Sequence, residues 1–292
     1  MSGRRGLNVA QSSVSAPASA AAPWFEPEWP APASVRALFT TRHGGVSAAP
    51  WDALNLGAHV GDRPEHVAQN RALLQAAVHE RGGGELLFLN QVHGCDVLDL
   101  DSQAPGESLS GRAADGSITG QPGQALVMMV ADCLPVLITD RAGQRVGAFH
   151  AGWRGLAGEQ GRGILESAVE AFVRARPQAP VLAASELLVW LGPCIGPAAF
   201  EVGEEVRQAF CSFQAEALGL FQPVPQRPGH WLADLAGLAR LRLRAAGVSA
   251  VYGNDGTTAW CTHTQSASFF SHRRDGHRLG GTGRMAACIW RV

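Results

Sequence analysis

Three short stretches of the chain place a cysteine or a histidine beside turn-forming residues. They read "NQVHG" (90–94), "ADCLP" (131–135) and "FHAGWRG" (149–155), and they contain His93, Cys133 and His150. Cysteine and neutral histidine are the preferred ligands of zinc, and a catalytic zinc site keeps three protein ligands and one open position for water or substrate. Taken singly, each of these residues is equally typical of a packed core position. Together they would supply the three protein ligands of such a site.

The positions of the three residues mean that only the fold can bring them together. They are 40 residues apart (93 to 133) and 17 residues apart (133 to 150), which matches no local zinc-finger spacing. Short apolar runs at 85–89, 125–130, 145–149 and 186–192 are typical of buried strands, and three of these runs end close to one of the candidate ligands. We therefore expect neighbouring strands to present the ligands at one place.

Helical patterns occupy the segments between these runs. They cover 62–84, with a capping pattern of Asp62 and Glu65 at its start, and also 203–218 and 233–246. Strands and helices do not alternate regularly, so the pattern predicts an α+β fold with mixed β-sheets. An Ala-, Ser- and Pro-rich stretch predicts a flexible leader over 1–33, followed by a single catalytic domain over 34–292.

The overall composition restricts the class of protein. Of the 292 residues, 46% are hydrophobic and 17% are charged, as in globular proteins, and the formal net charge is −1. This charge gives no general attraction to nucleic acid or to an anionic membrane surface. The leader lacks the apolar segment of a secretory signal, and no stretch is long enough to span a bilayer, so we expect a cytoplasmic protein whose six cysteines are mostly reduced.

All 24 basic residues are arginine, and the chain contains no lysine. Walker-type phosphate loops and Schiff-base chemistry both require lysine, so both are excluded. A bound phosphate must therefore be held by arginine side chains and backbone N–H groups. Polar residues near the motifs are candidates for substrate or phosphate binding, although each is also typical of a loop cap or a surface ion pair: Arg42, Asn55, Asp132, Arg154, Arg273 and Arg274.

Seven stretches in order resemble the YfiH-type family, also called laccase-domain or multicopper polyphenol oxidase-like proteins. The similarity covers roughly residues 35–292 and rests on these stretches: "FTTRHGGVSAAPWDALNLGAHVGD", "NQVHG", "ADGSIT", "MVADCLPVLITD", "GAFHAGWRGLAG", "LGPCIGPAAFEVG" and "CTHTQSASFFSHRRDGHRLGGTGRMAACIW". The chain departs from the usual family pattern at Glu159, where such sequences commonly continue with glycine. This departure affects a local turn and none of the ligand candidates.

The resemblance implies a layered α/β/β/α fold with one zinc site. It also implies a purine nucleoside phosphorylase that accepts adenosine, inosine and methylthioadenosine with phosphate, and that has adenosine deaminase activity. His93, Cys133 and His150 match the family's metal and catalytic positions, and Arg42 with Arg273 or Arg274 match its arginines. Zinc is the expected metal, with Cu²⁺ as the alternative, and the expected partners are a nucleoside and phosphate.

Two kinds of chemistry would use these residues. A zinc ion lowers the pKa of its bound water from about 15.7 to about 7, which suits deamination at C6 of adenosine. Phosphorolysis at C1′ of the ribose needs an anion clamp, for which Arg42 with Arg154 or Arg273 is our candidate.

Three other functions fit parts of the same pattern. A copper-dependent polyphenol oxidase is the family's older assignment, but the ten histidines include no His-x-His pair of the kind that multicopper oxidases use. A hydrolase that edits a peptidoglycan precursor would use the same three ligands. In a non-enzymatic interaction protein, zinc would only join strands, and such a site needs a fourth protein ligand.

Overall fold

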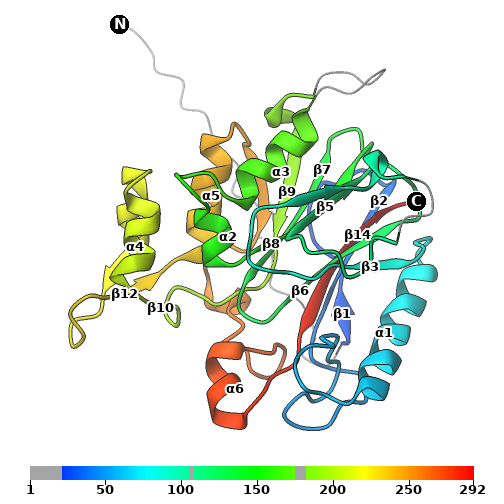
Figure 1. Ribbon diagram of the computed structural model, residues 1–292, viewed down its shortest axis with the longest axis horizontal. Coiled ribbons are helices and arrows are strands. Elements are labelled where there is room, and N and C mark those ends of the chain that lie inside the picture. The colour runs from blue at the N-terminus through cyan, green and yellow to red at the C-terminus, as the bar shows by residue number, and fades with distance from the viewer. Residues whose placement is uncertain (1–21, 105–107, 175–181) are drawn as a thin grey trace, which may run out of the picture.

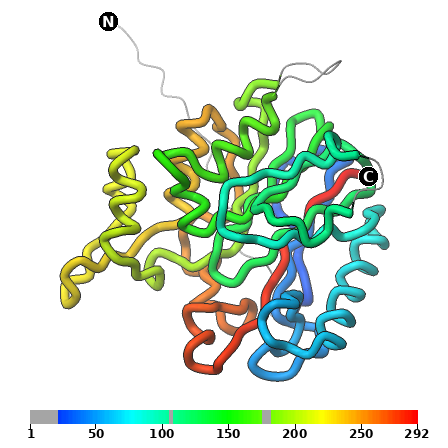
Figure 2. Tube along the Cα trace, viewed as in Figure 1, coloured from blue at the N-terminus to red at the C-terminus, as the bar shows by residue number. Residues whose placement is uncertain are grey.

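The computed structural model describes residues 22–104, 108–174 and 182–292. A five-stranded sheet contains both ends of the described chain, in the order β1 (Trp24–Phe25), β2 (Val35–Thr40), β14 (Met285–Arg291), β6 (Ala125–Val130) and β3 (Leu86–Phe88). The chain's blue beginning and red end therefore lie side by side in β2 and β14 (Figure 2). Only β3 and β6 are parallel, so the sheet is mixed.

A six-stranded mixed sheet packs against the first sheet. Its order is β13 (Ala250–Gly253), β9 (Leu187–Leu191), β7 (Leu134–Asp140), β8 (Val146–Ala151), β5 (Gly116–Thr119) and β4 (Val97–Asp99). The two outermost pairs are parallel and the inner pairs are antiparallel. A small third sheet consists of β10 (Glu201–Gly203), β12 (His230–Ala233) and β11 (Phe221–Pro223).

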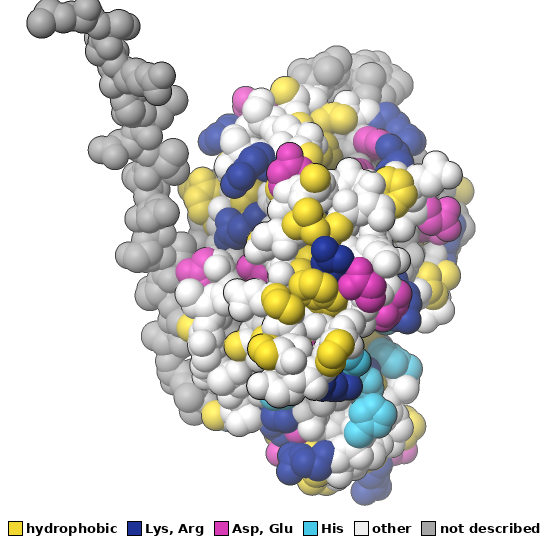
Figure 3. All heavy atoms as spheres, turned by 90° about the vertical axis from the view of Figure 1, so that its left-hand side faces the viewer, with side chains coloured by type: hydrophobic (Ala, Val, Ile, Leu, Met, Phe, Trp, Pro, Cys, Tyr) yellow, Lys and Arg dark blue, Asp and Glu magenta, His cyan; other side chains and the backbone are white. Residues whose placement is uncertain are grey.

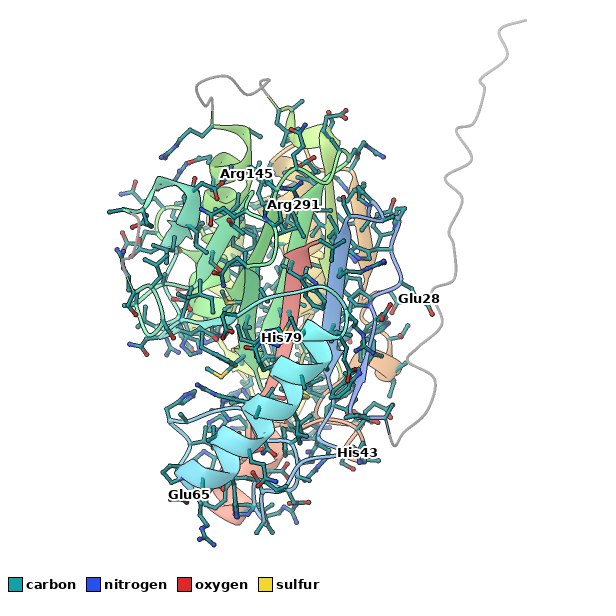
Figure 4. The ribbon with its side chains drawn as sticks, turned by 90° about the vertical axis from the view of Figure 1, so that its right-hand side faces the viewer. Glu28, His43, Glu65, His79, Arg145 and Arg291 are labelled. Atoms are coloured by element: carbon teal, nitrogen blue, oxygen red, sulfur yellow. The ribbon has the colours of Figure 1, made fainter. Side chains whose placement is uncertain are left out.

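The period-two alternation of strand β14 separates two hydrophobic cores. Met285, Ala287 and Ile289 pack between the sheets, whereas Ala286, Cys288 and Trp290 point to the other face. That other face is covered by α1 (Pro64–His79), which lies across the strands with Glu65 near its start and His79 near its end (Figure 4). One face of β14 therefore packs against the second sheet, and the other face packs against the helix α1.

The outer face of the six-stranded sheet carries the fourth layer. Its apolar side chains pack on α3 (Ile164–Val173) and α5 (Leu235–Ala245), so the order of layers is α/β/β/α (Figure 1). Shorter helices lie around this frame: α2 (Trp153–Ala157), α4 (Glu204–Cys211) and α6 (His272–Leu279). Single 3₁₀ turns cover Leu100–Ser102, Ala184–Glu186, Ala215–Leu220 and Thr258–Trp260.

The predicted α+β class with mixed sheets is confirmed, and several boundaries differ. The helix expected over 203–218 ends at Cys211, and a separate 3₁₀ turn follows. The capping pattern expected at Asp62 is wrong: α1 has Arg63 at its N-cap without a side-chain cap, and Asp62 accepts hydrogen bonds from Ser47 and Asn55 instead.

The leader predicted over 1–33 includes residues 22–33, which the structure describes. Strand β1 pairs Trp24 with Thr40 of β2, so residues 22–33 belong to the folded structure. Residues 1–21 lie outside the described residues. In the described part of the chain, no helix has both the length and the apolar composition needed to cross a membrane.

Candidate metal centre and active site

The three predicted ligands meet where the chain passes from one large sheet to the other. His93 lies in the connection from β3 to β4 and Cys133 in the connection from β6 to β7, and both connections join the two sheets. His150 lies within β8, near its end. The expectation of neighbouring strands was therefore wrong in part, because β3 and β6 are neighbours while β8 belongs to the other sheet.

The three side chains are close enough to share one metal ion. One ligand atom from each of His93, Cys133 and His150 lies within 4.8 Å of the others. The Cys133 Sγ is 3.7 Å from His93 Nε2, and the two imidazole centroids are 4.7 Å apart with an interplanar angle of 75°. Two nitrogens and one sulfur, with His93 exposed and His150 buried, suit a zinc site with one open position.

Asp115 holds two of the ligand segments at once. Its carboxylate accepts a hydrogen bond from His150 Nδ1 at 2.8 Å, which leaves Nε2 of that ring for a metal. The same carboxylate accepts hydrogen bonds from the backbone N–H groups of Val92, His93 and Gly94 at 3.1, 2.9 and 2.7 Å. We did not predict this residue, although it stands in the "ADGSIT" stretch directly before β5.

The loops that carry His93 and Cys133 have strained backbone conformations. His93 and Asp132 have φ angles of +62° and +89°, in the left-handed region that non-glycine residues rarely adopt. Asp115 holds the first loop, and Asp132 holds its own loop by accepting hydrogen bonds from Thr262 Oγ1 at 2.6 Å and from the backbone N–H of Arg273 at 2.7 Å. The predicted site residue Asp132 thus positions Cys133 rather than lining the cavity.

Two glycines of the "FHAGWRG" stretch allow close packing on the His93 loop. A methyl group at Gly152 would lie 2.8 Å from His93 Cδ2 and 3.1 Å from Cys133 Sγ, and one at Gly155 would lie 2.7 Å from the Gly94 carbonyl oxygen. The start of α2 can therefore follow His150 closely only because both residues lack a side chain.

The ligands form a charged pair in the absence of metal. Burial raises the pKa of the Cys133 thiol, but the neighbouring His150, with a smaller contribution from His93, outweighs burial and lowers this pKa to about 6. Burial likewise lowers the pKa of His150, but the Cys133 thiolate and Asp115 raise it to about 9. Asp115 has a lowered pKa because hydrogen bonds from His150 and Gly94 outweigh its burial. Each group therefore favours the charged form of the other, a thiolate beside an imidazolium.

A cavity of about 480 Å³ opens beside the three ligands, which is within the size range of small-molecule sites. No described carboxylate lines it, and apolar side chains form part of its wall. The lining consists of His59, Leu89, Asn90, Gln91, His93, Met129, Val130, Ala131, Cys133, His150, Arg154, His272 and Arg284.

The six predicted polar residues fall into two groups. Arg154 lines the cavity, with its guanidinium stacked 4.5 Å from the centre of the Trp153 ring. The other five do not line it. Arg42 donates to the carbonyl oxygens of Asp52 and Ser266 and pairs with the Asp52 carboxylate.

Asn55, Arg273 and Arg274 are likewise used within the protein. Asn55 is fully buried and is hydrogen-bonded to Gly57, Asp62 and the backbone N–H of Arg284. The Arg273 guanidinium donates to the Glu201 carbonyl oxygen. Arg274 pairs with Asp275 and donates to three carbonyl oxygens of nearby loops.

Five polar residues of the cavity were not among the predicted ones. They are His59, Asn90, Gln91, His272 and Arg284. Arg284 directly precedes β14 in "GTGRM", and His272 begins α6, so both stand at element boundaries where binding residues commonly lie. Both residues also lie in the last of the seven family-like stretches, so the sequence carried a signal for them.

A sequence comparison places the chain in a known family. The family described as multi-copper polyphenol oxidoreductase laccase matches residues 36–292. The chain belongs to this laccase-like family. A member from Pseudomonas aeruginosa, named purine nucleoside phosphorylase, is 48% identical over 91% of this chain and 98% of its own length. The purine nucleoside phosphorylase YfiH of Escherichia coli is 46% identical over the same shares.

The fold of the laccase-like family is shared as well. The crystal structure of a Neisseria meningitidis protein matches with a TM-score of 0.79 and 43% sequence identity, covering 92% of this chain and 99% of that one. The family's name mentions several coppers, but the described residues contain a single group of three His, Cys, Asp or Glu ligands, and all ten histidines of the chain are described. This donor set fits one metal ion.

Proposed function

We propose that the protein is a zinc-dependent purine nucleoside phosphorylase. The observation that carries the proposal is the cavity beside His93, Cys133 and His150, which two arginines line and no described carboxylate lines. Such a lining favours an anionic substrate such as phosphate over a cationic one. The names of the Pseudomonas and Escherichia relatives support the same activity.

The proposed reaction joins phosphate to the ribose and releases the base. An oxygen of hydrogen phosphate forms a bond to C1′ while the bond from C1′ to the purine nitrogen breaks, and the electron pair leaves with the purine, which takes up the proton that the phosphate gives up. The Arg154 guanidinium, exposed and without a carboxylate partner among the described residues, is free to bind the anion.

The remaining lining suits a purine. Leu89, Met129 and Val130 give apolar contact area, and none of the Phe, Tyr or Trp rings lines the cavity. Two amide side chains, of Gln91 and Asn90, lie beside them. The Gln91 amide donates to the Met129 carbonyl oxygen and accepts from the Met129 N–H, both at 2.8 Å. The Asn90 side chain forms no hydrogen bond with any described residue, so it is free to bind the edge of a base.

The metal would be held by His93, Cys133 and His150, and when bound it supplies Lewis-acid and water-activating chemistry. Asp115 keeps the His150 ring in the orientation that this ligation needs. The proposal includes adenosine, inosine and methylthioadenosine as substrates, and deamination of adenosine as a second activity of the same site.

The test is a product analysis with protein of known zinc content. Adenosine, inosine and methylthioadenosine are incubated with and without phosphate, and free base, pentose phosphate and inosine are separated by liquid chromatography. Phosphate-dependent release of free base supports the proposal. No turnover by folded, zinc-loaded protein contradicts it, and amino-acid release from a UDP-linked peptidoglycan precursor would then be the activity to assay.

A further inference from the structure

Arg284 is a half-buried cation without a carboxylate partner among the described residues. Its Nη1 donates to the carbonyl oxygens of Thr282 and Gly283 at 3.2 and 3.1 Å, and its Nε and Nη2 bond to no described residue. Burial lowers the pKa of this guanidinium, while Cys133 and Asp132 raise it. The guanidinium therefore lies in the field of Cys133 and Asp132, with its Nε and Nη2 free to donate.

The position of Arg284 is fixed from behind by a buried loop. Its backbone N–H donates to Asn55 Oδ1 at 2.9 Å, and its carbonyl oxygen accepts from the Leu56 N–H at 3.1 Å. A methyl group at Gly57 would lie 2.7 Å from Arg284 Cγ, so the stem of the arginine passes directly over this glycine. The buried Asn55 thus holds the arginine in place.

Two histidines of the cavity lie near this guanidinium. Neither His59 nor His272 hydrogen-bonds through its ring to any described residue, and both are exposed. Burial, followed by the charge of Arg284, lowers the pKa of each ring. On one face of the molecule histidine side chains gather beside arginines (Figure 3). The lowered pKa favours the uncharged ring, which can donate one hydrogen bond and accept another.

We infer that Arg284, with His59 and His272, forms the subsite that binds inorganic phosphate. The two free guanidinium donors suit two oxygens of one phosphate, and the imidazole N–H groups suit its remaining oxygens. The inference rests on the proposed function and names which residues hold its anionic substrate. Arg154 then contacts the anion or the ribose from the α2 side of the cavity.

The first experiment separates the two Michaelis constants. In Arg284→Met the stem is kept and the charge is removed, so the KM for phosphate should rise about tenfold or more, as expected for a lost charged hydrogen bond. The KM for inosine should change less than about twofold, and Arg284→Lys should recover part of the loss. Arg36→Met, on the exposed side of β2, is the matched control for a lost charge and should leave both constants unchanged.

The second experiment measures binding without turnover. Inorganic phosphate is titrated into the zinc-loaded protein by calorimetry, and Arg284→Met and His59→Gln should each weaken its binding, the arginine variant more strongly. Equal phosphate affinity in wild type and a folded Arg284→Met protein overturns the inference. Phosphate binding that needs Arg284, in a protein that releases no base from nucleosides, supports the subsite and contradicts the proposed phosphorolysis.

Discussion

Asp115 and His150 are joined twice across neighbouring strands of the second sheet. The His150 backbone N–H donates to the Asp115 carbonyl oxygen at 2.8 Å, and its Nδ1 donates to the Asp115 carboxylate at 2.8 Å. Because that carboxylate also holds the His93 loop, one buried acid fixes two of the three ligands. The hydrogen bonds between Asp115 and His150 therefore tie the geometry of the metal site to the second sheet.

Replacing Asp115 should weaken the metal site without changing any ligand. In Asp115→Asn the charge is lost, and an amide nitrogen replaces one accepting oxygen, so zinc affinity should fall about 10- to 100-fold. The free energy of unfolding should fall by about 1–3 kcal/mol, because buried donors lose their acceptor. Chelator competition and urea unfolding measure these two effects. Asp96→Asn, an exposed carboxylate in the β3–β4 connection that carries His93, is the control, and equal zinc affinity in both variants would show that Asp115 does not orient the ligands.

Gly152→Ala tests the close packing behind the ligands. The added methyl group would meet His93 Cδ2 at 2.8 Å and must displace the ring or the α2 start. We expect zinc content after purification to fall well below one ion per chain, with the far-ultraviolet circular dichroism spectrum retained. Gly219→Ala is the matched control, since a methyl group there meets nothing within 4 Å. Full zinc loading of Gly152→Ala would contradict this geometry.

The charged pair of Cys133 and His150 predicts how metal binding depends on pH. The Cys133 pKa of about 6 is below that of an ordinary thiol, and the His150 pKa of about 9 is above that of an ordinary imidazole. Between these values a metal must displace only the His150 proton, and below about pH 6 it must also displace the Cys133 proton. The protons of Cys133 and His150 alone should therefore make the logarithm of the zinc association constant rise by about one per pH unit between pH 6 and 9. Below pH 6 the rise should be steeper.

Alkylation of the metal-free protein reports the same thiolate. The rate of alkylation by iodoacetamide should rise with pH with a midpoint near pH 6. This transition should be absent in Cys133→Ala. Cys95→Ala is the control, because burial, followed by the charge of Asp115, raises the pKa of that thiol. A midpoint near that of free cysteine in the Cys95→Ala protein would count against the pair.

Two arginines that look equivalent in the sequence should behave differently when replaced. Arg154→Met removes a cavity cation, so kcat/KM for phosphorolysis should fall about tenfold or more while the melting temperature is retained. Arg42→Met removes the donor for two carbonyl groups and one carboxylate, so the free energy of unfolding should fall by about 1–3 kcal/mol with kinetics of the folded protein unchanged. Thermal unfolding and steady-state kinetics on both variants distinguish these roles, and the reverse pattern would refute this assignment.

The fold class followed from short-range patterns. Apolar runs and helical spacing gave the strands and helices, since both are set by local periodicity. The ligand group His93, Cys133 and His150 rested on the motif around each residue. β3 and β8 lie in different sheets because of long-range strand pairing, and local sequence patterns do not predict such pairing.

The supporting residues were harder to predict. Asn55 and Arg42 have the residue types of a substrate site, but the fold uses them to hold loops, because an amide or guanidinium binds a backbone carbonyl as readily as it binds a ligand. Conversely, Arg284 and His59 lie 225 residues apart (59 to 284) and acquire a common role only through the cavity that they line.

The most direct measurement is phosphate-dependent release of free base by the zinc-loaded protein, compared with Cys133→Ala and with the Cys95→Ala control. We predict that wild type and Cys95→Ala release base from inosine only when phosphate is present, and that Cys133→Ala, folded but depleted of zinc, releases none. Full phosphorolysis by zinc-free Cys133→Ala, or base release that does not depend on phosphate, would contradict the assignment of this cavity as a metal-dependent phosphorolysis site.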